Sequence, residues 1–172
     1  MADYGKWAQA GVPKKGWTCT GETVLPGRDE TCQMCERERI RFVHHMSHPN
    51  YGQLDCGCDC AARMEEDYTA ATRRDKNMKA SVRRRKSWPT LKAWRLSKNG
   101  NPIIEVDGYR VTIFRSGPWT GIVSNATTGL KHRLMQYPSI DDAKLAAFDA
   151  IRFVKHRDSA ANTNSSFQDV KS

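Results

Sequence analysis

The sequence lacks any long hydrophobic run. No segment approaches the roughly 18 to 20 consecutive apolar residues that a membrane-spanning helix requires. Residues 1–15 also lack the apolar stretch of a secretory signal, so we expect an unexported, cytoplasmic protein. At 172 residues and 38% hydrophobic composition, the chain is long enough for one domain or two small ones.

Signatures of common enzyme classes are also missing. The chain has no Gly-rich phosphate loop before a helix, no Gly-x-Ser-x-Gly motif, and no acidic pair in a glycosidase-like context. Glu65, Glu66 and Asp67 fall in the first turns of a predicted helix, where the helix dipole alone favours acids. The sequence therefore predicts no catalytic residue, and we expect a protein that is not an enzyme.

Acidic residues are nearly absent from one segment. Residues 73–98 carry eleven Lys and Arg and one acid, Asp75, while the whole chain has a net charge of +9. A basic segment this confined is typical of a surface that meets the phosphates of a nucleic acid, DNA more than RNA. Its alternatives are a solvated helix face and an acidic protein partner. The predicted helical contacts are Arg73, Arg74, Lys76, Lys79, Arg83, Arg84, Arg85 and Lys86.

The spacing of apolar residues predicts one amphipathic helix over residues 61–86, with a basic helix extending over 73–98. Its buried seam comprises Met64, Tyr68, Ala71, Met78 and Val82. Asp75 is the one polar break in that seam, and Pro89 ends the helix. The seam is interpreted as core packing, without a cofactor role.

The six cysteines favour metal binding, because disulfides are rare in unexported proteins. Cys32 and Cys35 form a Cys-x-x-Cys pair, and three more cysteines alternate at positions 56, 58 and 60. Cys58 and Cys60 lie nearest the predicted helix, so Cys32, Cys35, Cys58 and Cys60 are predicted to bind one structural Zn²⁺. Substitute ligands are Cys56, His44, His45 and His48. Free thiols, an iron–sulfur cluster and a redox pair are the alternatives, and Cys19 is interpreted as a small buried residue.

This order of a cysteine knuckle, a strand, a turn and a helix resembles a treble-clef zinc finger over residues 30–85. The stretch from His44 to His48 also invites comparison with HNH nucleases, in which a histidine at a strand end activates water. Asn50 could serve as the middle residue of that motif, but residues 61–86 contain no histidine for the last ligand. A metal-dependent nuclease is therefore kept as an alternative.

After residue 92 the pattern predicts an antiparallel β-meander followed by a helix. The expected strands are 94–98, 103–106, 109–114, 119–124 and 130–137, separated by Gly- and Asn-containing turns. Ser139 with Asp142 starts the helix, and His156-Arg157 closes it. The predicted class is α+β: an irregular arm (1–29), a zinc finger with a basic helix (30–90), a sheet-plus-helix module (91–157) and a disordered tail (158–172).

The run Ala146-Ala147-Phe148-Asp149-Ala150, together with the preceding strands, resembles the three-stranded-sheet DNA-binding domain of plant ethylene-response factors over residues 105–156. The resemblance implies an exposed sheet face that reads the major groove. It places Arg110, Thr112, Trp119, Lys131 and Arg133 on that face. The alternative is that Trp119 belongs to the core and the others to ordinary surface.

Together these features predict a zinc-stabilised nucleic-acid-binding protein whose basic helix contacts phosphates. The whole array resembles uncharacterised bacterial or phage zinc-containing proteins, which implies location at the nucleoid or in the host cytoplasm. Neither a membrane nor a small-molecule substrate is expected as a partner. The alternatives are the nuclease and a protein-interaction module or inhibitor that uses the same basic surface against a nucleic-acid enzyme.

Overall fold

The computed structural model of the chain describes the backbone of residues 4–165 and the side chains of residues 4–155. The fold is α+β, with antiparallel sheets and three α-helices among the described residues. It divides into two compact units, Met1–Arg83 and Arg84–Ser172. No helix in the described part of the chain is both long and apolar enough to cross a membrane.

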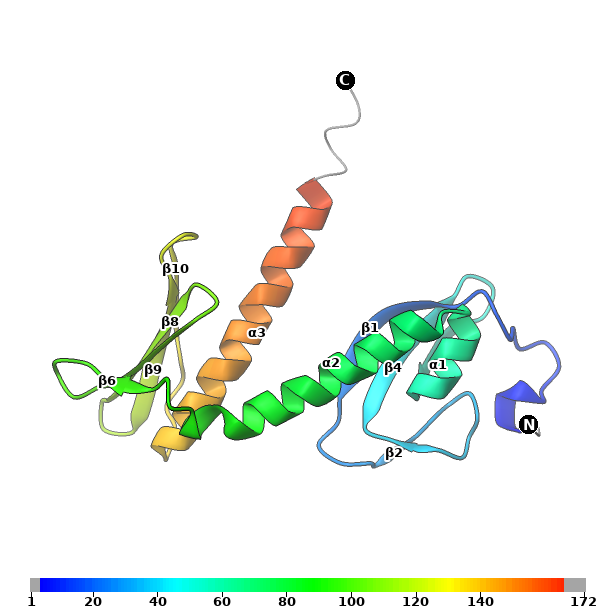
Figure 1. Cartoon of the computed structure of the whole chain (residues 1–172). Helices are drawn as coiled ribbons and strands as arrows, with labels where there is room; N and C mark the ends of the chain where they lie inside the picture. Colours follow the sequence, from blue (N-terminus) through cyan, green and yellow to red (C-terminus); the bar gives the residue numbers. More distant parts are fainter. Residues whose placement is uncertain (1–3, 166–172) are drawn as a thin grey trace, which may run out of the picture. The chain divides into compact units, whose positions relative to one another are not determined.

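The first unit is built on a three-stranded antiparallel sheet. Its order is β1 (Thr18–Val24), β4 (Phe42–His48) and β5 (Gly52–Cys56). A turn that contains Pro49 and Asn50 joins β4 to β5. Helix α1 (Cys58–Glu65) follows β5 directly and packs against β1 and β4 (Figure 1).

A second, smaller hairpin in this unit carries the cysteine knuckle. Strands β2 (Glu30–Thr31) and β3 (Arg39–Ile40) pair antiparallel, and Cys32 and Cys35 lie in the connection between them. The backbone N–H of Cys32 donates to the carbonyl of Glu38 at 2.8 Å, which closes the hairpin around the knuckle. Both cysteines are buried by this arrangement.

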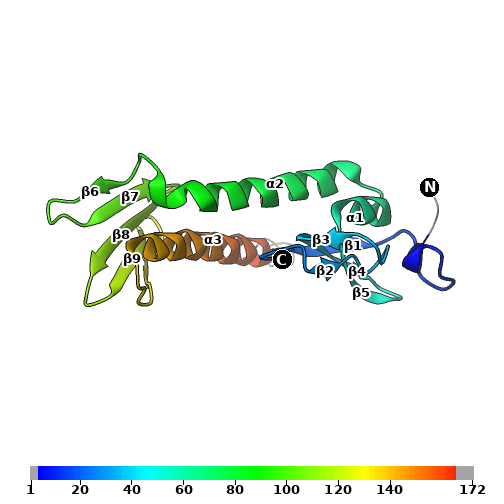
Figure 2. The ribbon, with the colours of Figure 1, turned by 90° about the horizontal axis from the view of Figure 1, so that it is seen from below.

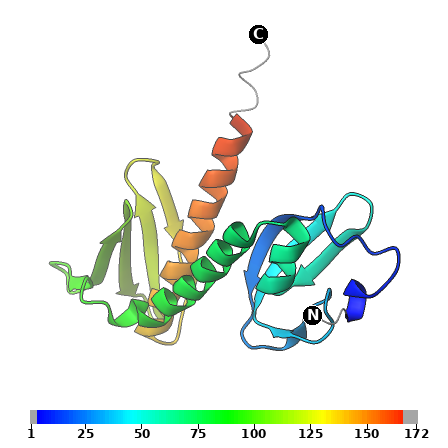
Figure 3. The same ribbon diagram turned by 45° about the vertical axis from the view of Figure 1, so that its right-hand side comes forward.

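The N-terminal segment is more ordered than the sequence indicates. The predicted irregular arm (1–29) contains a short 3₁₀ helix, η1 (Gly5–Trp7), and the seven-residue strand β1 (Figure 3). Trp7, Val12 and Trp17 are buried in the same core as the cysteine knuckle. The apolar side chains of this segment therefore contact parts of the chain that sequence periodicity does not connect.

The helix predicted over residues 61–86 is two helices. Helix α1 ends at Glu65, Glu66 adopts a left-handed conformation with φ of 57°, and α2 (Tyr68–Ser87) begins after Asp67. The Asp67 carboxylate accepts a hydrogen bond from the N–H of Ala70 at 2.8 Å, which caps the new helix. Met64, Ala71 and Met78 of the predicted seam are buried, whereas Tyr68, now the first residue of α2, is 61% exposed.

The basic segment 73–98, predicted as a helix, is α-helical only in part, because α2 ends just before Pro89, where the sequence also predicts the helix end. Helix α2 ends at Ser87 and is followed by a 3₁₀ turn, η2 (Trp88–Thr90), which contains Pro89. Proline disfavours helical geometry in the residue before it, which explains the end of α2 at this point. The last three cations of the basic segment lie beyond the helix: Lys92, Arg95 and Lys98.

The second unit confirms the predicted antiparallel meander. Five strands lie in sequence order: β6 (Arg95–Leu96), β7 (Pro102–Val106), β8 (Tyr109–Arg115), β9 (Trp119–Asn125) and β10 (Leu130–Arg133). Helix α3 (Ile140–Ser165) packs against β8 and β9 (Figure 2). The core between them includes Val111, Ile113, Val123, Ala147 and Ile151.

Both ends of helix α3 can be compared with the sequence. The Ser139 hydroxyl accepts a hydrogen bond from the N–H of Asp142 at 3.1 Å, as expected for the predicted cap. The helical backbone then continues to Ser165, past the predicted end at Arg157. No Gly or Pro follows Ser139, so nothing in the backbone chemistry stops it early. Of the predicted disordered tail, residues 166–172 lie outside the described residues.

Candidate metal centre and basic surface

Three cysteine sulfur atoms meet in the core of the first unit. The Sγ atoms of Cys32, Cys35 and Cys60 lie within 4.8 Å of one another, and all three side chains are buried. Three soft sulfur ligands around one point could hold a metal ion and are compatible with zinc. The knuckle supplies two of these sulfurs, and the first turn of α1 supplies the third.

A backbone N–H group and the helix start support this cluster electrostatically. The N–H of Gly57, the residue before α1, donates to Sγ of Cys32 at 3.4 Å. The positive end of the α1 dipole also lies beside Cys60. Both features favour thiolate over thiol, which is the form that binds a metal.

Cys56, the last residue of β5, is a further buried cysteine of this core, but its sulfur is not one of the three that lie within 4.8 Å of one another. Its thiol donates to Sδ of Met64 at 3.6 Å. Hydrogen bonds from Cys56 and Cys60 hold the pKa of Cys32 well below its usual range. The same bonds, together with burial, raise the pKa of the Cys56 and Cys60 thiols.

Cys58, one of the four predicted ligands, does not join this cluster. It lies in a separate group with His44 and Asp75. Cys58 and Cys60 are both helical residues, and a separation of two residues turns their side chains about 200° apart around the helix axis. The structure therefore brings together three of the predicted ligands and adds the substitute Cys56 beside them.

Trp7 contacts the cluster from the N-terminal segment, a contact that the sequence does not predict. Its indole N–H donates to Sγ of Cys60 at 3.4 Å. The guanidinium of Arg63 lies over the Trp7 ring, 4.0 Å from its centroid, and keeps that ring in place. A lone tryptophan 25 residues before the first cysteine of the knuckle carries no local signal of this contact.

Gly5 approaches the knuckle so closely that no side chain fits. A Cβ at this position would lie 2.6 Å from the carbonyl oxygen of Cys35. We expect Gly5→Ala to destabilise the first unit by about 1–3 kcal/mol more than Gly11→Ala, because only Gly5 gains a clash. Gly11 is the matched control: its φ is also positive, at 79°, but a Cβ added there would have no described atom within 4 Å. Denaturant unfolding of both variants measures the difference, and equal stabilities would contradict the contact.

Trp7→Phe tests the indole contact with the cluster. The substitution keeps an aromatic ring but removes the N–H that reaches Cys60, and loss of such a supporting bond typically weakens metal affinity about 10- to 100-fold. Trp17→Phe is the control, because its buried indole N–H donates instead to the Pro13 carbonyl at 2.9 Å. Competition with a zinc chelator should separate the two variants. Equal zinc affinities of the two variants would show that the Trp7 indole does not support the metal site.

The histidines predicted as substitute ligands lie outside the cysteine cluster. His45 uses both ring nitrogens: Nδ1 lies 2.6 Å from an Asp55 carboxylate oxygen, and Nε2 lies 2.8 Å from the Thr23 hydroxyl. The nuclease comparison needs a histidine nitrogen that is available to water, and His45 offers none in this arrangement. His48 packs against the Trp17 ring.

Helix α2 distributes its predicted phosphate contacts over two sides. Arg73, Lys76 and Arg83 are exposed and fall within about 80° of one another around the helix. Arg74 is half-buried and ion-paired with Glu65 and Glu22, and Lys79 pairs with Asp75 at 2.6 Å. We call Arg73, Lys76 and Arg83 the outer basic face.

The end of α2 belongs to the second unit, where Arg84, Arg85 and Lys86 are exposed. Arg85 forms two hydrogen bonds with the Asp149 carboxylate, at 2.9 and 2.8 Å, and this contact raises the pKa of its guanidinium. Its charge is thus engaged within the unit. Arg84 and Lys86 remain at the surface as the helix ends.

An exposed aromatic ring accompanies the outer basic face. Tyr68, Arg73 and Lys76 line a shallow hollow of about 510 Å³ at the start of α2. A ring beside two cations is the combination that stacks on a base while neighbouring charges contact the phosphates. The helical spacing in the sequence instead predicts a core position for this tyrosine.

The open face of the sheet in the second unit carries four of its five predicted contacts. Arg110 and Thr112 on β8 share that face with Lys131 and Arg133 on β10, through their pairing with β9. Trp119 lies on the opposite face, because it alternates with Thr120 and aligns with Val123 toward the core. The structure thus gives Trp119 the core position that was the alternative to a place on the exposed face.

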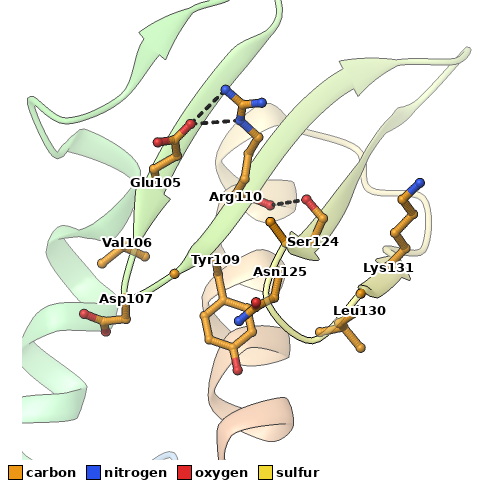
Figure 4. Close-up of a pocket in the computed structure, with 12 residues that line it drawn as sticks. Glu105, Val106, Asp107, Tyr109, Arg110, Ser124, Asn125, Leu130 and Lys131 are labelled. Carbon is orange, nitrogen blue, oxygen red and sulfur yellow. Dashed lines mark hydrogen bonds and ion pairs between the residues drawn. The ribbon is translucent and has the colours of Figure 1, made fainter.

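Arg110 is engaged on that face by an acid. Glu105 accepts ion pairs from Arg110 at 2.8 Å and from Arg95 at 3.3 Å. Glu105 and Arg110 line an open cavity of about 740 Å³ that extends to Lys131 (Figure 4). The carboxylate reduces the positive charge of the sheet face.

Comparison with known proteins assigns no family to this chain. No family model, curated protein or solved structure matches it.

Proposed function

We propose that the protein is a zinc-stabilised nucleic-acid-binding protein. In the first unit, Cys32, Cys35, Cys56 and Cys60 hold one structural Zn²⁺ as a four-sulfur site. This assignment is supported by the burial of all four side chains, by the Cys32, Cys35 and Cys60 sulfurs that lie within 4.8 Å of one another, and by the effect of Cys32 on the pKa of Cys56. The metal fixes the knuckle against the start of α1, as in the treble-clef fingers that the sequence resembles.

Helix α2 supplies the nucleic-acid surface. The observation that carries this proposal is the outer basic face, on which Arg73 and Lys76 line a hollow together with the exposed Tyr68. The cations bind phosphates and release counterions, which gives affinity without sequence information. Tyr68 adds stacking with an unpaired base. The sheet face of the second unit, with Lys131 and Arg133, supplies any base preference.

Crosslinking tests this function directly. Nucleic acid crosslinked to the protein in cells, and then sequenced, identifies whether DNA or RNA is bound. Recovery of no nucleic acid above the level of an outer-basic-face variant would contradict the proposal. A protein partner that remains bound after nuclease treatment would support the interaction module instead. Nicking of plasmid with Mg²⁺, lost in His45→Ala, would support the nuclease.

Tyr68→Ala tests the stacking contact. We expect binding to a single-stranded oligonucleotide to weaken by about 1–3 kcal/mol, the usual contribution of one base–aromatic stack. Tyr68→Phe should retain most of the affinity, because its ring face is unchanged. Tyr51→Ala is the control, since Tyr51 is 38% exposed but packs against Trp17. Fluorescence anisotropy measures all four proteins, and an equal effect of Tyr51→Ala would contradict the assignment.

A further inference from the structure

A second group of metal-binding side chains lies in the first unit, apart from the four-sulfur cluster. Ligand atoms of His44, Cys58 and Asp75 lie within 4.8 Å of one another. The three residues come from β4, α1 and α2, so only the folded unit brings them together (Figure 1). From this group we infer a second metal site, which binds a zinc-like divalent ion through one nitrogen, one sulfur and one oxygen.

The imidazole of His44 has an unused nitrogen in the core. The side chain is fully buried, and Nε2 has no hydrogen-bond partner among the described residues. A buried polar atom without a partner costs about 1–3 kcal/mol, so such atoms usually have a ligand. Nδ1 accepts a hydrogen bond from Nε of Arg74 at 3.4 Å, so binding of a metal through Nε2 requires the ring proton to move to Nδ1 and this long contact to be given up.

The arrangement converges on a point rather than forming a relay. In a Cys-His-Asp nucleophile triad, the acid contacts one ring nitrogen and the cysteine contacts the other. Here a single ligand atom from each residue lies near the other two. Around a tetrahedral zinc ion these atoms are separated by roughly 3.5 Å, so modest side-chain rotations complete the geometry.

The two cations nearest the group, Lys79 and Arg74, are paired with acids, which reduces their repulsion of a metal ion. Lys79 binds Oδ2 of Asp75, so Oδ1 remains for the metal. Arg74 is the other nearby cation, and Glu65 and Glu22 hold its guanidinium. A thiolate from Cys58 and the Asp75 carboxylate then supply two negative charges to the ion. Metal binding would thus explain Asp75, the one acid in the apolar seam of α2.

Three protein ligands leave a fourth position open. Cys58 and Asp75 line a cavity of about 370 Å³, whereas His44 lies behind them in the core. Water from this cavity can occupy the fourth position, as in zinc sites with three protein ligands. The second site is therefore accessible to solvent, unlike the buried four-sulfur site.

Zinc content of the full-length protein tests this inference. After dialysis, we expect two zinc ions per chain for the wild type and one for Asp75→Asn and Cys58→Ser, with circular dichroism unchanged. Asp59→Asn is the matched control, because Asp59 lines the same cavity but is outside the ligand group. One zinc per chain in the wild type would overturn the second site, as would an Asp75→Asn variant that still binds two.

The absorption spectrum of Co²⁺-loaded protein gives a second readout. The second site contributes a single Co–thiolate bond with nitrogen and oxygen ligands, so Asp75→Asn should remove a spectral component distinct from that of the four-sulfur site. If Asp75→Asn leaves the spectrum unchanged and Cys58→Ser alters the sulfur-rich component, Cys58 belongs to the first site and the inference fails. Neither readout depends on nucleic-acid binding.

Discussion

Cys32→Ser is expected to release the zinc of the four-sulfur site and to unfold the first unit. Cys32 is one of the three grouped sulfurs, it is fully buried, and its Sγ accepts a hydrogen bond from the N–H of Gly57. Structural zinc contributes about 10–16 kcal/mol of binding free energy in small zinc domains, which exceeds the usual stability of a domain of this size. Hydrogen exchange should show loss of protection in β1, β4, β5 and α1, together with reduced zinc content. A chelator should have the same effect on the wild type.

The identity of the fourth ligand follows from comparing two further variants. Cys56→Ser should behave like Cys32→Ser, whereas Cys58→Ser should retain the fold of the first unit. Cys19→Ser is the control, because Cys19 is outside both ligand groups and its thiol donates to the Gly21 carbonyl at 3.3 Å. If Cys58→Ser unfolds the unit and Cys56→Ser does not, the fourth ligand is Cys58, as the sequence predicts, and not Cys56.

Nucleic-acid affinity is expected to fall steeply with salt and to depend on the outer basic face. Replacing Arg73, Lys76 and Arg83 together by Ala should reduce the slope of log affinity against log salt by up to about 2.7 for duplex DNA. A slope of this size corresponds to a roughly 40-fold loss of affinity for duplex DNA between 50 and 200 mM salt. The variant should therefore bind more weakly than the wild type at low salt and differ less from it at high salt.

A charge-matched variant separates this surface from net charge. Replacing Lys15, Arg115 and Arg152 by Ala removes the same three charges from exposed positions outside α2. Its salt slope should stay close to that of the wild type, because the lost charges contact no phosphate. If the slope of log affinity against log salt falls by the same amount in both triple variants, general electrostatic attraction explains the binding and α2 is not the interface. If the log affinity of the wild type does not change with log salt, the protein makes no phosphate contacts.

The second unit was the more predictable part of the fold. Its strands are short, alternate between apolar and polar residues, and are joined by local turns, so neighbours in sequence are neighbours in the sheet. The Ser139 cap likewise depends on residues three apart. The first unit depends on distant pairings, such as β1 with β4 and Trp7 with Cys60, for which no local pattern exists.

The helical region over residues 58–87 shows why a periodic pattern can mislead. The positions of Met64 and Tyr68 fit one helix, but the left-handed Glu66 and the Asp67 cap divide it. Ala71 and Met78 are buried, as the spacing predicts, but Tyr68 at the start of the second helix is exposed. A spacing rule assumes an unbroken helix, so it cannot assign a face across a break.

Sequence alone determined that the cysteines cluster, that the positive charge follows them and that a meander with a helix ends the chain. These features depend only on residue type and on short spacings along the chain, so they do not require knowledge of the tertiary structure. Only the tertiary structure decided how the sulfurs are divided. The α1 helix turns Cys58 and Cys60 to opposite sides, so Cys60 joins Cys32 and Cys35, while Cys58 meets His44 and Asp75. The N-terminal segment, featureless in sequence, supplies the indole beside Cys60 because burial of Trp7 brings it there.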